Sequence, residues 1–171
     1  MKEQSQTLTA VKTAIQMEID GKQYYQQAAQ ASQNDLGRKL FLQLATEEDS
    51  HRKKFEEIYQ ALRVKESWPD VSIKLHQGRE LKTLFAIAGK DVKSSTSELE
   101  AVQTAMSMEN KTRDFYQLQA RKADFSIEKD YYEALAKEES AHHAVLLDYY
   151  EYLQNPAGWF TMKERHSLDG G

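Results

Sequence analysis

Cysteine is absent from all 171 residues of the chain. Its absence excludes disulfide bonds, thiolate zinc sites, cysteine-ligated iron–sulfur clusters and a cysteine nucleophile. Any metal that this chain binds must therefore be held mainly by oxygen and nitrogen atoms.

Glycine and proline are scarce, with 7 and 2 residues. Because helix breakers are few and alternating β-branched stretches are lacking, long helices are favoured over a sheet. No apolar run approaches the ~20 residues that span a bilayer, and residues 1–10 carry no apolar signal core. We therefore expect an all-α protein of the cytoplasm without a membrane partner.

Positive charge is not concentrated in any segment. The net charge is −4 and 29% of the residues are charged. This mild acidity, without a basic stripe, argues against a nucleic-acid partner. The length suffices for one domain with a real core, so we expect residues 1–171 to form a single domain.

An internal repeat relates the two halves of the chain at a separation of 91 residues. Residues 8–62 and 99–153 align without a gap and share 17 identities in 55 positions. Apolar residues in each copy recur at alternating steps of three and four, which is the period of an amphipathic helix. Each copy reads as two helices, so we predict four helices, over roughly 6–31, 35–63, 95–122 and 126–153.

The predicted connections define the topology. Asn34-Asp35 and Asp124 mark tight turns, with Asp35 or Ser126 as candidate N-caps, so each copy forms an αα-hairpin. A crossover over 64–94 joins the hairpins and is long enough to hold a short helix of its own. Two hairpins joined by one long crossover predict a ferritin-like four-helix bundle.

Residues 154–171 are expected to form a C-terminal tail. Asn155-Pro156 ends the fourth helix, and Trp159 and Phe160 are expected to pack against the bundle. From His166 onward we expect a loose chain.

Each predicted helix carries a glutamate in the middle of its apolar seam. A charge in a bundle core costs several kcal/mol unless it is paired or coordinated. Two of the glutamates are followed by a histidine three residues later, one turn along the same helix face. Two divalent cations would balance four carboxylates, so we predict a dinuclear site formed by Glu18, Glu48, His51, Glu109, Glu139 and His142.

A glutamate from each of two helices and Glu-x-x-His from the other two is the ligand set of di-iron and di-manganese carboxylate bundles. We expect two iron ions as the cofactor, although manganese or zinc would also suit these donors. Imidazole and carboxylate ligands with open positions suit iron that reacts with oxygen species.

Four further residues belong to the predicted surroundings of the site. Tyr25 and Tyr116 lie two turns beyond Glu18 and Glu109 on the same faces. They either donate hydrogen bonds to ligand carboxylates or are plain core aromatics, and we favour the first interpretation. Glu47 and Glu138 either orient the opposite histidine or lie on a solvated flank, and the sequence does not choose between these.

Other polar residues receive weaker interpretations. Lys22 and Arg113 match across the repeat and either pair with core carboxylates or extend to solvent. His76, His143 and His166 are expected to be surface histidines.

The segments 14–25 and 44–51, with their counterparts 106–116 and 135–142, resemble the rubrerythrin branch of the ferritin-like superfamily. The resemblance covers about 145 residues. It implies that Glu48 and Glu139 bridge two irons. It also implies terminal ligation by Glu18 with His51 and by Glu109 with His142.

The chain departs from that family pattern in two ways. Rubrerythrins carry a rubredoxin domain whose iron is held by four cysteines, and this chain has no cysteine. They also have a second glutamate one turn after the ligand of the third helix, where this chain has Thr112. The remaining six-residue set is similar to the bacterioferritin ferroxidase centre.

We expect a di-iron oxidoreductase that reduces peroxide or O2, with electrons from a separate donor protein, and a homodimer as the assembly. Three alternatives stay open at the level of sequence. They are a ferroxidase that feeds an iron store, a hydroxylase of an organic substrate, and a non-enzymatic metal-binding helical bundle.

Overall fold

The computed structural model describes residues 2–65, 67–71 and 96–168, and side chains within 5–65, 67–71 and 97–162. The helices are α1 (Lys2–Ala31), α2 (Asp35–Val64), α4 (Thr96–Lys122), α5 (Ser126–Gln154) and α6 (Pro156–Leu168). No strand occurs within the described ranges. Nor does any helix there have the length and apolar character needed to cross a membrane. The all-α prediction is confirmed.

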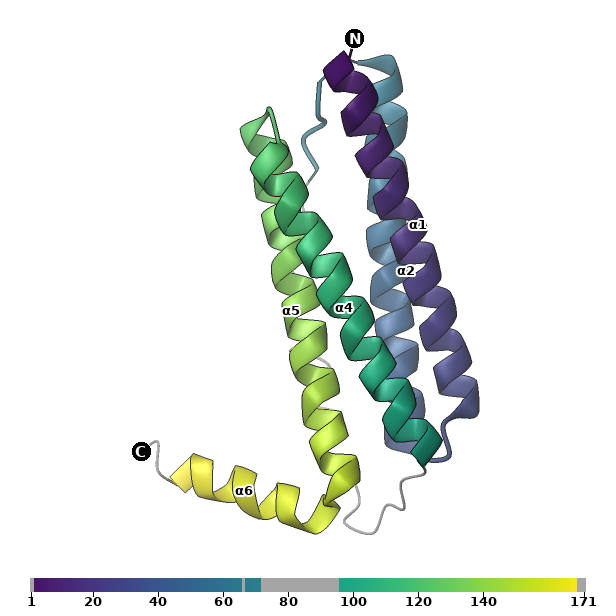
Figure 1. The fold of residues 1–171 in the computed structure, drawn as a ribbon, viewed down its shortest axis with the longest axis vertical. Helices are drawn as coiled ribbons and strands as arrows, with labels where there is room; N and C mark the ends of the chain where they lie inside the picture. The colour runs from purple at the N-terminus through teal and green to yellow at the C-terminus, as the bar shows by residue number, and fades with distance from the viewer. Residues whose placement is uncertain (1, 66, 72–95, 169–171) are drawn as a thin grey trace.

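Two antiparallel hairpins, α1/α2 and α4/α5, lie side by side and form the predicted ferritin-like four-helix bundle (Figure 1). The hairpins diverge toward the end of the bundle where α1 begins. Residues 67–71 follow α2 and run back between the hairpins at that end. The short helix expected in the crossover lies outside the described residues.

The turn between α1 and α2 is fixed by a side-chain cap. The N-cap of α2 is Asn34, whose Oδ1 accepts a hydrogen bond of 2.7 Å from the Gly37 N–H. Asp35 is instead the first helical residue, so its assignment as the cap is wrong. Ser126 is likewise the first residue of α5, because the extended backbone of a cap belongs to Phe125.

The C-terminal tail contains a helix that the sequence analysis did not predict. Pro156 begins α6, a position that suits proline because the first N–H groups of a helix have no intrahelical partner. Asn155 caps this helix by accepting a 3.0 Å hydrogen bond from Gly158 N–H. The chain is helical through Leu168, so the expectation of a loose chain from His166 is wrong up to that residue. Trp159 packs edge-on against Tyr152 of α5, with ring centroids 5.9 Å apart.

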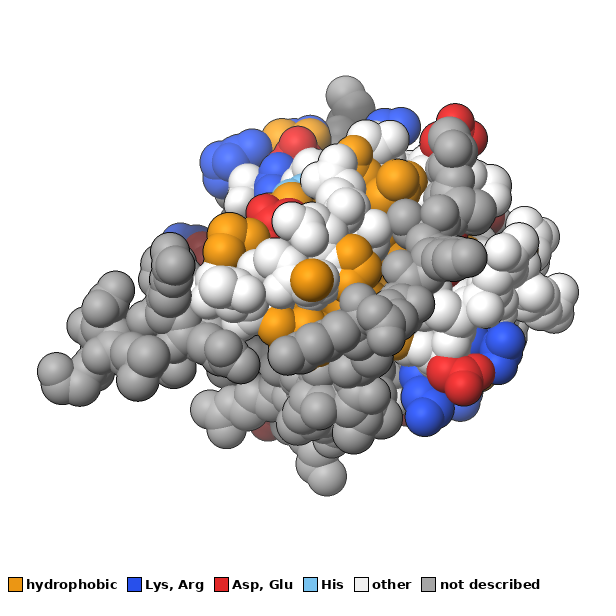
Figure 2. Space-filling view, turned by 90° about the horizontal axis from the view of Figure 1, so that it is seen from below, with side chains coloured by type: hydrophobic (Ala, Val, Ile, Leu, Met, Phe, Trp, Pro, Cys, Tyr) orange, Lys and Arg blue, Asp and Glu red, His pale blue; other side chains and the backbone are white. Residues whose placement is uncertain are grey.

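The hydrophobic core consists of two clusters, one toward each end of the bundle. One includes Phe41, Tyr149 and Trp159, and the other includes Phe55, Trp68 and Tyr132. Burial of each large apolar side chain contributes roughly 1.5–3 kcal/mol relative to exposure. Seen from the end near α6, hydrophobic side chains occupy the middle of the face and charged ones its margins (Figure 2).

A buried polar network joins the α1–α2 turn to the second hairpin. Glu98 of α4 accepts hydrogen bonds from Ser32 at 2.6 Å and from Asn34 Nδ2 at 2.9 Å. The Tyr149 hydroxyl of α5 donates to the same carboxylate oxygen at 2.8 Å. Asn34 thus serves both as the cap of α2 and as a link between the hairpins.

Replacement of Asn34 by alanine is expected to destabilise the fold by more than the ~1 kcal/mol typical of a lost N-cap, because Glu98 also loses a buried donor. The measurement is the urea midpoint of unfolding by circular dichroism. Asp35→Ala is the control, since Asp35 is exposed and does not cap the helix. Equal effects of the two substitutions would contradict the assigned cap.

Candidate metal centre

The structure brings all six predicted ligand residues together in the middle of the bundle. α1 contributes Glu18, α2 contributes Glu48 and His51, α4 contributes Glu109, and α5 contributes Glu139 and His142. All six side chains are buried. The packing of four helices against one another thus assembles the site, since no helix carries more than two of the residues.

The six residues form two overlapping groups with the spacing of metal ligands. Glu18, Glu48, His51 and Glu139 make one group, and Glu48, Glu109, Glu139 and His142 make the other, each with candidate ligand atoms within 4.8 Å of one another. Glu48 and Glu139 belong to both groups. This sharing is the arrangement expected when two carboxylates bridge two metal ions.

Each histidine is held by a glutamate of the opposite hairpin. Nε2 of His51 lies 2.8 Å from Glu138 Oε2, and Nε2 of His142 lies 2.8 Å from Glu47 Oε2. Of the two interpretations of Glu47 and Glu138, the structure thus supports contact with the opposite histidine. A carboxylate partner at Nε2 favours the tautomer that leaves Nδ1 free to bind a metal.

The Nδ1 atoms of both rings face the carboxylates. Nδ1 of His142 lies 3.3 Å from Glu48 Oε1, and Nδ1 of His51 lies 3.5 Å from Glu18 Oε2. Among the described residues, neither Nδ1 atom makes a hydrogen bond, and neither does either oxygen of Glu139. Buried polar atoms without partners are costly. Their convergence on one point therefore fits the donor set of a pair of cations.

The two tyrosines also reach across the bundle. The Tyr25 hydroxyl donates a hydrogen bond to Glu109, and the Tyr116 hydroxyl donates one to Glu18. Of the two interpretations of these tyrosines, the structure thus supports donation to ligand carboxylates, which the sequence did not specify individually. Because α1 and α4 pack against each other, each hydroxyl reaches the carboxylate of the other helix.

Electrostatics at the site favour positive charge. Burial, with the neighbouring carboxylates Glu18 and Glu109, raises the pKa of Glu48 well above its ordinary value. Burial also raises the pKa of Glu139. Burial lowers the pKa of His142, but Glu109 and other nearby carboxylates outweigh it, so that this pKa is raised overall. These three groups therefore hold their protons tightly, and a metal ion would displace them.

Gly21 lets the backbone of α1 approach Glu48 closely. A Cβ atom at this position would come within 2.6 Å of Glu48 Oε2. The repeat counterpart of Gly21 is Thr112, the position where the sequence lacks the extra glutamate of the family pattern. At Gly21 the space that a side chain would need is already occupied by a ligand carboxylate.

The remaining polar residues lie at the margin of the site. Lys22 pairs with Asp49 at 2.8 Å rather than with a core carboxylate. Arg113 pairs with Asp114 at 2.8 Å, on the outer side of α4. His143 is half-buried, whereas His76 and the side chain of His166 lie outside the described residues.

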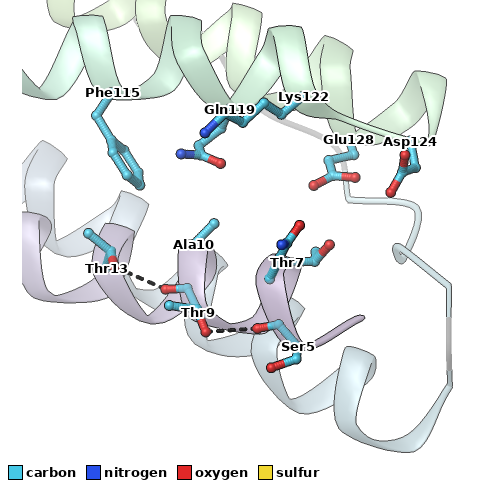
Figure 3. Close-up of a pocket in the computed structure, with 11 residues that line it drawn as sticks. Ser5, Thr7, Thr9, Ala10, Thr13, Phe115, Gln119, Lys122, Asp124 and Glu128 are labelled. Carbon is cyan, nitrogen blue, oxygen red and sulfur yellow. Dashed lines mark hydrogen bonds between the residues drawn. The ribbon is translucent and has the colours of Figure 1, made fainter. Parts of the chain in front are cut away.

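A cleft of about 690 Å³ lies away from the six ligand residues. It is bordered by the first turns of α1 and by the end of α4 with the start of α5 (Figure 3). Threonine and serine line its α1 side, where Thr9 donates to the Ser5 carbonyl and Thr13 to the Thr9 carbonyl. None of the six ligand residues lines this cleft.

Comparison with known proteins agrees with the geometry. A family model described as rubrerythrin matches residues 10–150, which is most of the chain. The chain belongs to the rubrerythrin family. No curated protein and no solved structure matches it significantly. The rubrerythrin match covers most of α1, all of α2 and α4 and nearly all of α5, and therefore every one of the six clustered residues.

Replacement of Gly21 by alanine is expected to weaken metal binding without weakening the fold. Alanine favours a helix over glycine by roughly 1 kcal/mol, whereas the added Cβ displaces the Glu48 carboxylate. We expect a loss of about 10- to 100-fold in affinity, as for other changes that misorient a ligand. Anaerobic competition with a chromophoric chelator measures the affinity, and thermal unfolding of the metal-free protein measures stability.

Thr112→Ala is the matched control, because Thr112 occupies the equivalent position of the repeat on α4 and already carries a Cβ. It should leave the affinity unchanged. An unchanged affinity in Gly21→Ala would contradict the close approach.

Proposed function

We propose that this rubrerythrin-family chain is a di-iron oxidoreductase that reduces peroxide or O2 with electrons from a separate donor. The observation that supports this most is the pair of overlapping ligand groups that share Glu48 and Glu139. Beyond the two shared glutamates, each group offers one carboxylate and one imidazole, from Glu18 with His51 or from Glu109 with His142. Neither ion would therefore depend on a single helix. Iron bound there supplies one-electron redox changes at two adjacent ions, which together match the two-electron reduction of peroxide.

The protein's own residues would hold and tune the ions. Glu47 and Glu138 fix the histidine rings with Nδ1 toward the ions. Burial and the nearby Glu109 raise the pKa of Tyr25, so its phenol stays a hydrogen-bond donor to that carboxylate. The equivalent donation from Tyr116 restrains Glu18. The buried aliphatic and aromatic side chains on both sides exclude bulk water from the ligands.

The same donors suit manganese or zinc. Zinc has no redox chemistry, and of the two redox-active ions we propose iron. The electron donor is proposed to be a separate protein. We also propose that the protein is a homodimer, that it is cytoplasmic, and that it does not bind nucleic acid.

A ferroxidase of bacterioferritin type is the second candidate function. It is favoured by the six-residue ligand set, which lacks an added glutamate at Gly21 and at Thr112. The two functions differ in assembly, since a ferroxidase that feeds a mineral core requires a hollow shell. Gel filtration of the iron-loaded protein therefore distinguishes them, with a large shell supporting storage and a dimer supporting the lead proposal.

The binding part of the proposal predicts two Fe(II) ions per chain. Anaerobic titration should saturate at this ratio, and Glu48→Ala combined with Glu139→Ala should abolish binding, because both shared ligands are lost. The matched control is Glu133→Ala, which removes an exposed glutamate of α5. Unaltered binding in the double variant would rule out the assigned site.

Stopped-flow oxidation of the Fe(II)-loaded protein tests the reaction. A peroxidase should be oxidised faster by H2O2 than by O2, and an electron donor should restore the reduced state for further turnovers. Oxidation only by O2, followed by accumulation of mineral iron, would favour the ferroxidase. An inert Fe(II) site would contradict both functions.

A further inference from the structure

The only two tryptophans of the chain, Trp68 and Trp159, are separated by the same 91 residues as the ligand sets. They lie beyond the aligned copies, yet both are buried and belong to opposite clusters of the core. Each terminates a run of aromatic rings that begins at one of the two tyrosines bonded to a ligand carboxylate. The repeat thus includes more than the metal ligands.

On one side the run is short, and each of its rings is a phenol or an indole. Tyr116 donates to Glu18, and its ring centroid lies 5.9 Å from that of Tyr132. The Tyr132 ring in turn lies 5.5 Å from that of Trp68. These separations are those of rings in contact. Electron transfer falls steeply with distance, so a chain of contacting rings carries an electron far better than aliphatic packing does.

On the other side the run is interrupted. Tyr25 contacts Phe41 at 6.1 Å, and Phe41 contacts Tyr149 at 6.1 Å. Phe41 is the repeat counterpart of Tyr132. A benzene ring without a hydroxyl group is much harder to oxidise than a phenol or an indole. The two halves therefore differ in the ring that contacts the ligand-bonded tyrosine, which is Tyr132 in one half and Phe41 in the other. The packing of these rings is otherwise alike.

We propose that Tyr116, Tyr132 and Trp68 form a path that carries a single oxidising equivalent away from the metal centre to a reductant outside the bundle. The inference rests on the proposed redox function of that centre. Reduction of peroxide to water takes two electrons. A metal centre that has only one electron to give would therefore need one more from the protein. The path supplies that electron before the ligand side chains are oxidised.

The electrons and protons of the path balance. Tyr116 gives one electron to the centre, and its phenolic proton passes along the hydrogen bond to Glu18. Trp68 then gives an electron through the Tyr132 ring to the Tyr116 radical, which takes its proton back from Glu18. The Trp68 radical cation is reduced by an external one-electron donor. The net change is one electron transferred from that donor to the centre.

Hydrogen bonding divides the roles along the path. Oxidation of a phenol requires a proton acceptor, and Tyr116 has Glu18. Within the described part of the chain, the Tyr132 hydroxyl and the Trp68 Nε1 have no hydrogen-bond partner. An indole can lose an electron while it keeps its proton, so Trp68 can carry the charge in transit to the external donor. Tyr132 acts as the connecting ring, and its electron-rich phenol connects better than the benzene ring of Phe41 does.

The outer end of the path lies close to solvent. Trp68 itself is 5% exposed, but its neighbours Ser67 and Asp70 are exposed. This segment lies between the hairpins at the end where they diverge (Figure 1). A donor that contacts Ser67 or Asp70 at the surface would therefore lie close to the Trp68 ring.

The test uses metal-free protein, so that it does not depend on the proposed function. Because the chain has no cysteine, Ser67→Cys gives a unique attachment point for a ruthenium photo-oxidant beside Trp68. After a laser flash, transient absorption should show a tryptophan radical that converts to a tyrosyl radical, because the photo-oxidant drives the same path inward from Trp68 to Tyr116. In Tyr116→Phe, which keeps the ring packing, the tryptophan radical should persist and the tyrosyl signal should be lost.

Two further variants test the connecting ring. Tyr132→Leu should slow the conversion, whereas Phe41→Leu, which removes the equivalent buried ring of the other half, should leave it unchanged. An unchanged tyrosyl signal in Tyr116→Phe would overturn the proposal, since it would place the radical on another tyrosine. An unchanged rate in Tyr132→Leu would also overturn it.

The iron-loaded protein provides a second readout that is not activity. After H2O2 is added without an electron donor, peptide mass mapping should find oxidation at Trp68 that is lost in Tyr116→Phe. Equal oxidation of Trp68 in both proteins would contradict the path. Failure to bind iron would instead contradict the proposed function and leave the photochemical result standing.

Discussion

Four glutamate side chains buried at one level of a helical bundle constrain everything around them. Their mutual repulsion and loss of hydration oppose folding unless cations or protons compensate. The structure meets this constraint with contacts between the hairpins. Tyrosine hydroxyls of one hairpin bond to Glu109 and Glu18 of the other, and Glu47 and Glu138 bond to the opposite histidines. The same contacts join the two halves of the bundle.

This crossed arrangement gives the site its approximate two-fold symmetry. Every ligand and every supporting residue has a partner 91 positions away, and each supporting contact crosses from one copy to the other. The symmetry is broken where the copies differ in chemistry. Gly21 corresponds to Thr112 in the repeat, and Phe41 corresponds to Tyr132. The two metal positions would therefore not have identical surroundings. The difference between Phe41 and Tyr132 restricts the proposed electron path to one half of the bundle.

The ends of the bundle show how a repeat can acquire separate roles. At one end Glu98, Asn34 and Tyr149 form a closed polar network that fixes the α1–α2 turn. At the other end the hairpins diverge, and Trp68 fills the space between them against Tyr131 and Tyr132. Aromatic packing there replaces the hydrogen bonds of the first end. The bundle is thus joined by a polar network together with apolar packing at one end, and by aromatic packing around Trp68 at the other.

The sequence by itself determined the helical class, the two hairpins and the six candidate ligands, because helical periodicity and the repeat are local patterns. It could not choose between the roles of Glu47 and Glu138, and it did not specify which ligand carboxylate each tyrosine bonds to. It also missed α6 and the Asn34 cap. These features depend on which helix faces which, and on the backbone conformation at single residues. Only the tertiary structure decided them, since contacts between residues some 80 to 100 positions apart are set by packing and not by spacing along a helix.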